Sequence, residues 1–156
     1  MQSQTRIFTR IVGEFAIEAP VVLHSGDTVR DLVARMAEAE RSSALVVDEA
    51  GKPIGIVTER DVVRRITLRC SGSEPVSAVM TSPVRAVSTT DYLYHAIAVM
   101  RRQGWRHMPV VDPAGRLVGI IERHQALALA AEQTVDLIHK LSHEGTVDGL
   151  REILSL

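Results

Sequence analysis

The stretch GIVTERD, Gly55 to Asp61, ends an apolar run and starts a polar helix, and the chain repeats it imperfectly as GIIERHQ, Gly119 to Gln125. In the first copy Thr58 is followed three residues later by Asp61. This spacing is typical of a helix start, where the two side chains satisfy free backbone N–H groups. The same groups could instead bind a ligand, since a hydroxyl and a carboxylate are both acceptors. Because the stretch occurs twice, it also indicates an internal duplication.

An internal repeat with a spacing of 64 residues organises the chain. Four identities keep this spacing, namely Met36 and Met100, Asp48 and Asp112, Gly51 and Gly115, Gly55 and Gly119. Each copy begins with apolar residues at positions i, i+3, i+4 and i+7, over 29–36 in the first copy and 93–100 in the second. This period predicts a one-sided helix at the start of each repeat.

Each predicted helix is followed by two short apolar runs with a glycine-containing turn between them. The runs are ALVVD and PIGIV in the first repeat, and MPVVD and LVGII in the second. They predict a β-hairpin that leads into a second helix. Upstream, APVVL and SPVRAV match at a spacing of 63, so we expect a one-residue slip between the loops SGDT and STTD. The predicted unit is therefore β-α-β-β-α.

The predicted fold class is α/β, in the α+β sense, with two β-α-β-β-α repeats packed with pseudo-two-fold symmetry and a C-terminal helical extension. A small sheet with helices on one face leaves its other face apolar, so the repeats should bury these faces against each other. We assign 1–17 to a leader or joint, 18–71 to repeat 1, 72–133 to repeat 2 and 134–156 to C-terminal helices. The linker is placed at 68–75, where Gly, Ser and Pro cluster.

Composition and charge argue against several classes of protein. The chain has one Trp, two Tyr, two Phe and a net charge of -1, so neither a stacking platform nor a phosphate-backbone footprint for nucleic acid is expected. The single cysteine, Cys70, cannot form an internal disulfide, which fits a reducing compartment. The apolar runs are too short for a membrane span, and the N-terminus lacks the apolar core of a signal peptide. We therefore expect a cytoplasmic protein with no nucleic-acid or membrane partner.

The duplicated unit, with GIVTERD at the second strand-to-helix junction, resembles a tandem pair of cystathionine-β-synthase-type (CBS) domains, also called a Bateman module. The resemblance covers residues 19–131 and rests on SALVVDEAGKPIGIVTERDVV and RHMPVVDPAGRLVGII. It implies a regulatory module that binds an adenosine-containing ligand between the repeats and modulates an attached or partner domain. It also implies a homodimer formed through the one-sided helices.

The resemblance gives Thr58 and Asp61 their expected roles. In the family, the Ser or Thr after the second hairpin strand contacts phosphate, and the Asp three residues later holds the ribose hydroxyls. The chemistry agrees, because a carboxylate accepts two hydrogen bonds from a cis-diol and a helix N-terminus favours phosphate. The alternative is that both residues only cap the helix, and the two roles are compatible because a carboxylate has several acceptor positions.

The second copy of the motif departs from the family pattern. Glu122 stands in place of the Ser or Thr, and Gln125 stands in place of the Asp. A carboxylate repels phosphate, and an amide is a weaker acceptor for a diol than a carboxylate. We therefore expect one well-equipped cleft, around Thr58 and Asp61, and leave open whether the second cleft binds anything.

Basic residues of the second repeat are expected to complete the first cleft. By resemblance to family members that bind nucleotides, Arg106, His107 and His124 reach the ligand phosphates across the module. A guanidinium pairs with phosphate oxygens, and a histidine beside phosphate stays protonated. These charges favour AMP, ADP or ATP over the cationic S-adenosylmethionine, without choosing among them or excluding NAD. The alternative for Arg106 and His107 is an exposed polar edge before a buried strand.

Three small apolar residues, Ala19, Val21 and Ala44, are candidate walls for an adenine ring, with ordinary core packing as the alternative. The sequence shows no nucleophile with a base, no paired catalytic carboxylates and no Walker-type phosphate loop, so we do not expect an enzyme. His139 and His143 lie four residues apart but have no evident third ligand, so no metal site is predicted.

The tail, 134–156, resembles the segment that follows the CBS pair in bacterial multidomain proteins with a nucleotidyltransferase region. We therefore expect that the chain is a piece of a longer protein. The alternative to nucleotide sensing is a ligand-free dimerisation or interaction scaffold of a larger signalling protein. Both interpretations predict a dimer, so oligomeric state does not separate them.

Overall fold

The structure, a computed structural model, describes residues 10–15, 18–67 and 69–143. It confirms the β-α-β-β-α order in both repeats. Repeat 1 contains β1 (Val21–His24), α1 (Val29–Glu38), β2 (Ser43–Val47), β3 (Pro53–Thr58) and α2 (Glu59–Asp61), which continues as the π-helical turn η2 (Val62–Ile66). Repeat 2 contains β4 (Val87–Ser88), α3 (Leu93–Gln103), β5 (His107–Val111), β6 (Leu117–Glu122) and α4 (Arg123–His143).

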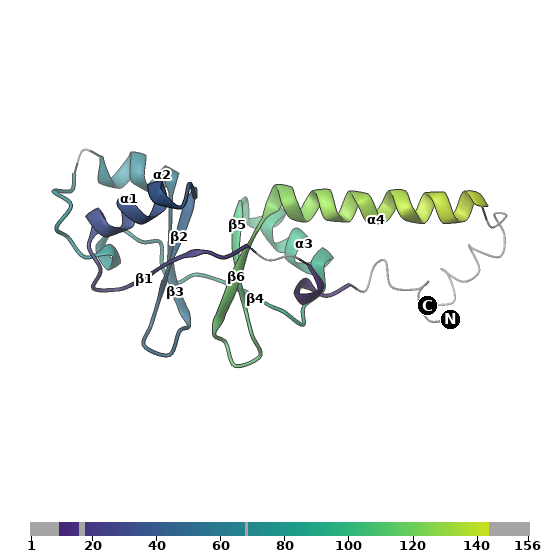
Figure 1. The fold of residues 1–156 in the computed structure, drawn as a ribbon, viewed down its shortest axis with the longest axis horizontal. Helices are drawn as coiled ribbons and strands as arrows, with labels where there is room; N and C mark the ends of the chain where they lie inside the picture. Colours follow the sequence, from purple (N-terminus) through teal and green to yellow (C-terminus); the bar gives the residue numbers. More distant parts are fainter. Residues whose placement is uncertain (1–9, 16–17, 68, 144–156) are drawn as a thin grey trace.

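The two repeats have the same sheet topology. In each three-stranded sheet the first strand is parallel to the second, and the second is antiparallel to the third, which gives the orders β1-β2-β3 and β4-β5-β6. The hairpins lie side by side at the centre, and the helices lie on the outer sides (Figure 1). The predicted fold class, with pseudo-two-fold symmetry and a C-terminal helical extension, is confirmed.

Local chemistry explains why the Asp and Gly identities of the repeat occur together. In the hairpin of repeat 1, Asp48 Oδ1 accepts hydrogen bonds at 2.9 Å from the backbone N–H groups of Ala50 and Lys52. Gly51 completes the turn with a φ of 76°, a conformation that favours glycine. Asp112 accepts the same two bonds in the second hairpin. The two tips touch, because Leu117 N–H donates to the Gly51 carbonyl at 2.9 Å.

Each repeat begins earlier than predicted, with a short turn that packs on the other repeat. The turn η1 (Val12–Glu14) places Val12 in the core of repeat 2, and η3 (Val76–Ala78) places Val76 in the core of repeat 1. The two valines are 64 residues apart and both are fully buried. Residues 10–15, predicted to belong to a separate leader, therefore form part of the packed module.

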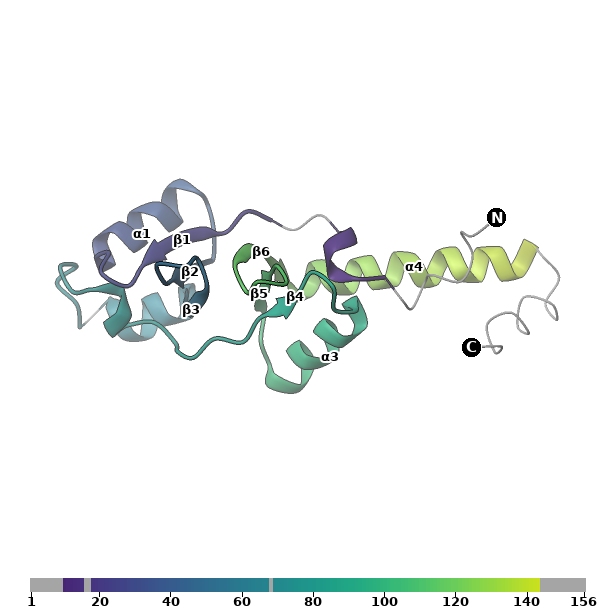
Figure 2. The ribbon, with the colours of Figure 1, turned by 90° about the horizontal axis from the view of Figure 1, so that it is seen from below.

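The chain then crosses from one repeat to the other alongside the central hairpins. Glu18 forms a β-bridge with Ile120 of β6, and Thr81 forms one with Ile56 of β3. Figure 2 shows the two crossing segments on opposite sides of the hairpins. The pseudo-symmetric arrangement therefore places the start of each repeat against the last strand of the other.

The one-residue slip lies upstream of the predicted position. The loops SGDT and STTD have the same length, because His24 N–H donates to Asp27 and Ser88 N–H donates to Asp91 at the common spacing of 64. The bridges of Glu18 and Thr81 are 63 apart, whereas the strand register returns to 64 at Leu23 and Val87. The placement in the loop was therefore wrong, and repeat 2 has its extra residue within 82–86.

The helix α4 runs without a break across the predicted boundary between 133 and 134. It extends away from the sheets as the longest helix (Figure 1). Residues 144–156, which include most of the predicted terminal helix, lie outside the described residues. Within 10–15, 18–67 and 69–143, no helix has the length and apolar character that a membrane span requires.

The packing of η1 predicts that Val12 stabilises the module although it was assigned to a leader. Val12→Ala removes two methyl groups from a fully buried site, so we expect a loss of about 2 kcal/mol in the free energy of unfolding. Val63→Ala is the matched control, because Val63 is 70% exposed and its truncation should change stability by less than about 0.5 kcal/mol. Urea unfolding of both variants measures the difference. Equal effects would show that 10–15 does not pack as described.

Candidate functional site

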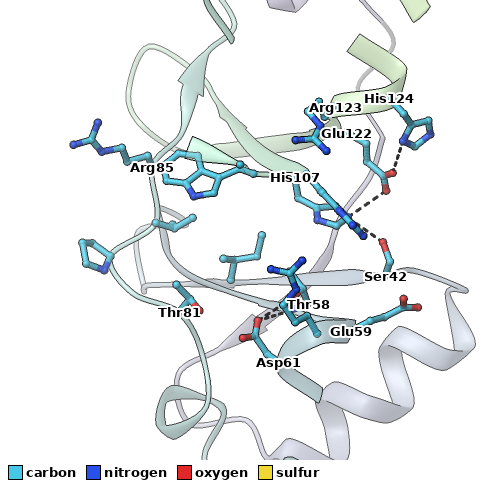
Figure 3. A pocket seen from close by; sticks show the side chains of 17 residues that line it. Ser42, Thr58, Glu59, Asp61, Thr81, Arg85, His107, Glu122, Arg123 and His124 are labelled. Atoms are coloured by element: carbon cyan, nitrogen blue, oxygen red, sulfur yellow. Dashed lines mark hydrogen bonds and ion pairs between the residues drawn. The ribbon is translucent and has the colours of Figure 1, made fainter. Parts of the chain in front are cut away.

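A cavity of about 600 Å³ lies between the two repeats. It brings together five of the predicted site residues: Thr58, Asp61, Arg106, His107 and His124. Figure 3 shows residues of repeat 1 on one side of the cavity and residues of repeat 2 on the other. The lining consists of Ser42, Ile56, Thr58, Glu59, Arg60, Asp61, Thr81, Pro83, Val84, Arg85, Gly104, Trp105, Arg106, His107, Glu122, Arg123 and His124.

One end of the cavity is built around Asp61 at the start of α2. Asp61 Oδ2 accepts hydrogen bonds from the Thr58 backbone N–H at 2.9 Å and from the Thr58 hydroxyl at 3.0 Å. Its other oxygen, Oδ1, lies 3.7 Å from Arg65 Nε. The capping contacts expected under the alternative interpretation are therefore present. A carboxylate has about four acceptor positions, so capping leaves Asp61 able to accept further bonds from a ligand.

The apolar part of this end comes from the crossing segment of repeat 2. Thr81, Pro83 and Val84 line the cavity opposite Asp61, because the Thr81–Ile56 bridge holds their segment along β3. The predicted adenine walls Ala19, Val21 and Ala44 do not line this cavity.

The reason is the crossing of the two chain segments. Val21 and Ala44 are buried in the core of repeat 1, and Ala19 is exposed beside Glu18, on the segment that bridges to β6. Ala19 corresponds to Ser82 at the spacing of 63, so the equivalent stretch of repeat 2, SPV, serves the Asp61 end. Sequence analysis chose the right kind of stretch in the wrong repeat.

The other end of the cavity lies across the pseudo-two-fold axis. Four pairs of lining residues are related by the spacing of 64, namely Ser42 and Arg106, Thr58 and Glu122, Glu59 and Arg123, Arg60 and His124. Asp61 is different, because its equivalent Gln125 does not line the cavity. The cavity thus consists of a shared central region and one asymmetric end.

The lining carries more cationic than anionic side chains. Four arginines, Arg60, Arg85, Arg106 and Arg123, lie with three carboxylates, Glu59, Asp61 and Glu122, and two histidines. Arg85 and Arg123 were not among the predicted site residues. Arg85 follows the SPV stretch in the segment that contains the extra residue, and Arg123 starts α4. Their charges, with a helix N-terminus nearby, suit an anion.

His107 lies at the contact between the repeats. Its Nε2 is 3.0 Å from Ser42 Oγ and 3.7 Å from Glu122 Oε1 (Figure 3). Burial lowers the pKa of His107 below its usual value of 6.5, and Glu122 only partly opposes that effect. The prediction of a protonated histidine therefore does not hold for the ligand-free protein at neutral pH, because desolvation disfavours the imidazolium.

Glu122 faces the first cavity, although sequence analysis considered it for the second cleft. Its carboxylate lies between His107 and His124, whose Nδ1 is 3.2 Å from Glu122 Oε2. Ser42 and Glu122 approach the same ring nitrogen of His107. They do not form a nucleophile relay, in which the carboxylate must orient the ring through its other nitrogen.

Comparison with known proteins agrees with the repeat seen in the fold. The family model described as CBS domain matches twice, at residues 12–68 and 76–132. These matches begin at Val12 and Val76, the buried residues of the two exchanged turns. Among the described residues, no group of three His, Cys, Asp or Glu side chains is arranged to hold a metal ion.

Individual relatives share the sequence and the fold over most of the chain. An uncharacterized 17.7 kDa protein of Acidianus ambivalens is 31% identical over 80% of this chain and 76% of its own length. A CBS domain protein from Pyrobaculum aerophilum, solved in complex with AMP, is 29% identical with a TM-score of 0.66, covering 78% of this chain and 98% of that one. The cytosolic domain of the Mg²⁺ channel MgtE, solved in complex with ATP, is 26% identical with a TM-score of 0.62, covering 70% and 44% respectively. The chain therefore belongs to the CBS domain family and carries two copies of that domain.

Proposed function

We propose that this chain is a regulatory module that binds an adenine nucleotide, AMP, ADP or ATP, and modulates an attached or partner domain. The observation that carries the proposal is one cavity that combines a carboxylate on a helix start, Asp61, with a surplus of arginines. Two similar CBS structures contain AMP and ATP, which supports the class of ligand. Nothing in the lining selects the number of phosphates.

The lining suggests how the ligand is divided along the cavity. The ribose hydroxyls donate to Asp61, and the adenine ring packs on Pro83 and Val84 of the crossing segment. The phosphates extend toward the shared central region, where Arg106 and Arg123 supply positive charge. Because both repeats contribute contacts, the nucleotide stabilises one relative orientation of the repeats and shifts its population. That shift is the signal passed to another domain.

A second candidate function is a scaffold that binds no nucleotide. The specific observation in its favour is that Asp61 already accepts both bonds of a helix cap from Thr58. The excess of arginines around an empty central region is not explained by capping, so we place nucleotide binding first. Under both proposals the module itself is non-catalytic, acts in the cytoplasm, forms a homodimer through its helices, and connects through 134–156 to a further domain.

Asp61 is expected to be essential for nucleotide affinity. We expect Asp61→Ala to weaken AMP binding about 10-fold to 100-fold, which is the usual loss when hydrogen bonds to a charged acceptor are removed. Asp31→Ala is the matched control, because Asp31 accepts the same two bonds from Thr28 at the start of α1 and does not line the cavity. Isothermal titration of both folded variants measures the difference. Equal AMP affinity in the two would favour the scaffold.

Arg106 is expected to act on phosphate alone. We expect Arg106→Ala to weaken AMP binding about 10-fold, since it removes a charge-assisted contact, and to change adenosine binding less than about twofold. Arg102→Ala, on α3 and outside the cavity lining, is the control for overall charge. A parallel loss for AMP and adenosine would show that Arg106 does not meet the phosphates.

His107 should make phosphate binding depend on pH. Its pKa is lowered in the ligand-free protein, and a bound phosphate would raise that pKa, so binding takes up a proton between the two values. Affinity for AMP should therefore increase as pH falls from 8 toward 6. The ratio of wild-type affinity to that of His107→Gln corrects for titration of the nucleotide's own phosphate. A ratio that stays constant with pH would contradict a phosphate contact by His107.

A further inference from the structure

The pseudo-symmetric equivalent of the Asp61 end is occupied by a side chain of the protein itself. Glu18 lies on the crossing segment beside β6, where its carbonyl accepts from Ile120 N–H at 3.1 Å. Its carboxylate accepts a hydrogen bond from Gln125 Nε2 and forms an ion pair with Arg41. Gln125 is at the position that corresponds to Asp61, and Arg41 follows α1. Three separate parts of the chain therefore meet at one carboxylate.

The chemistry of these three groups is complementary. Gln125 uses its oxygen to accept from Glu122 N–H at 3.3 Å, which leaves its amide N–H group to donate to Glu18. An aspartate at position 125 would have no donor for Glu18 and would repel it. Sequence analysis treated Gln125 as a poor acceptor for a ribose. The structure shows that its donor group is the part in use.

Glu18 also lies where the second cleft would need space and acceptors. On the opposite side, the equivalent residue Thr81 is one of the lining residues of the open cavity near Asp61. In the second cleft the longer Glu18 side chain reaches Gln125 and uses its donor. A ribose there would find an amide already bonded and a carboxylate held by Arg41.

We propose that Glu18 is an intramolecular occupant of the second cleft, so that the chain binds one adenine nucleotide and not two. This proposal rests on the proposed function for its ligand. The bonds themselves have a second effect, because they fasten the crossing segment to the end of α1 and the start of α4. The second cleft holds the two repeats together with a side chain, whereas the first does so with a ligand.

A double-mutant cycle tests the occupant without any nucleotide. Thermal unfolding is measured for Glu18→Ala, Gln125→Ala and the double variant of the full chain. We expect the double variant to lose less in Tm than the sum of the two single variants, because the contact is removed only once. Glu18 is partly exposed, so these variants are expected to fold. Additive losses would overturn the Glu18–Gln125 contact.

Binding stoichiometry tests the consequence for ligands. We expect wild type to bind one adenosine per chain, and the variant Glu18→Ala/Gln125→Asp to bind two, because the occupant is removed and a ribose acceptor is supplied. Adenosine is the probe, since its lack of phosphate avoids competition in the shared central region. Gln125→Asp alone, which keeps Glu18, should still bind one.

The outcomes separate the two proposals. Two adenosines bound to wild type, or one bound to the folded Glu18→Ala/Gln125→Asp variant, would overturn the role of Glu18. Absence of any adenosine or AMP binding to wild type would overturn nucleotide sensing. In that case the double-mutant cycle still decides whether Glu18 occupies the second cleft.

Discussion

The structure depends on the exchange of the first turn between the two repeats. Val12 precedes repeat 1 in the sequence but is buried in the core of repeat 2, and Val76 is buried in the core of repeat 1. Neither core is complete without a segment from the other half, so the repeats are held at a fixed distance and orientation. The cavity exists because the crossing segments that follow these turns run along the far strand of the opposite repeat. Packing of two valines thus determines where a ligand can contact both halves.

The symmetry of the module makes the centre of the cavity common to both halves and leaves differences only at its ends. In the centre, Ser42 and Arg106 are equivalent positions, and both line the same space. At the ends, Asp61 and Gln125 are equivalent, but one is a capped carboxylate and the other is an amide bonded to Glu18. A single substitution between repeats therefore changes an acceptor into a donor. In this way duplicated sequences acquire unequal clefts without a change of fold.

Sequence predicted the features that local chemistry determines. The helices, hairpins and turns followed from periodicity and from the Asp and Gly residues of the turns, and Asp61 followed from its place at a helix start. The exchange of η1 and η3 was missed because two buried valines in short turns have no period to reveal them. Arg85, Arg123 and the position of Glu122 were missed because they depend on how two distant segments approach. The lowered pKa of His107 depends on burial, which a polar residue before a strand does not indicate.

The position of α4 gives the proposed signal a physical route. Its first residues, Arg123 and His124, line the cavity, and the helix then continues to His143, away from both sheets. The Arg123 N–H donates to the carbonyl of Arg106 at 2.8 Å, so the helix start is tied to the residue expected to meet phosphate. A charge bound in the central region would act on the first turn of α4 directly, without an intervening loop. Because a helix transmits rotation of its first turn along its length, the cavity and the far end of α4 are mechanically linked.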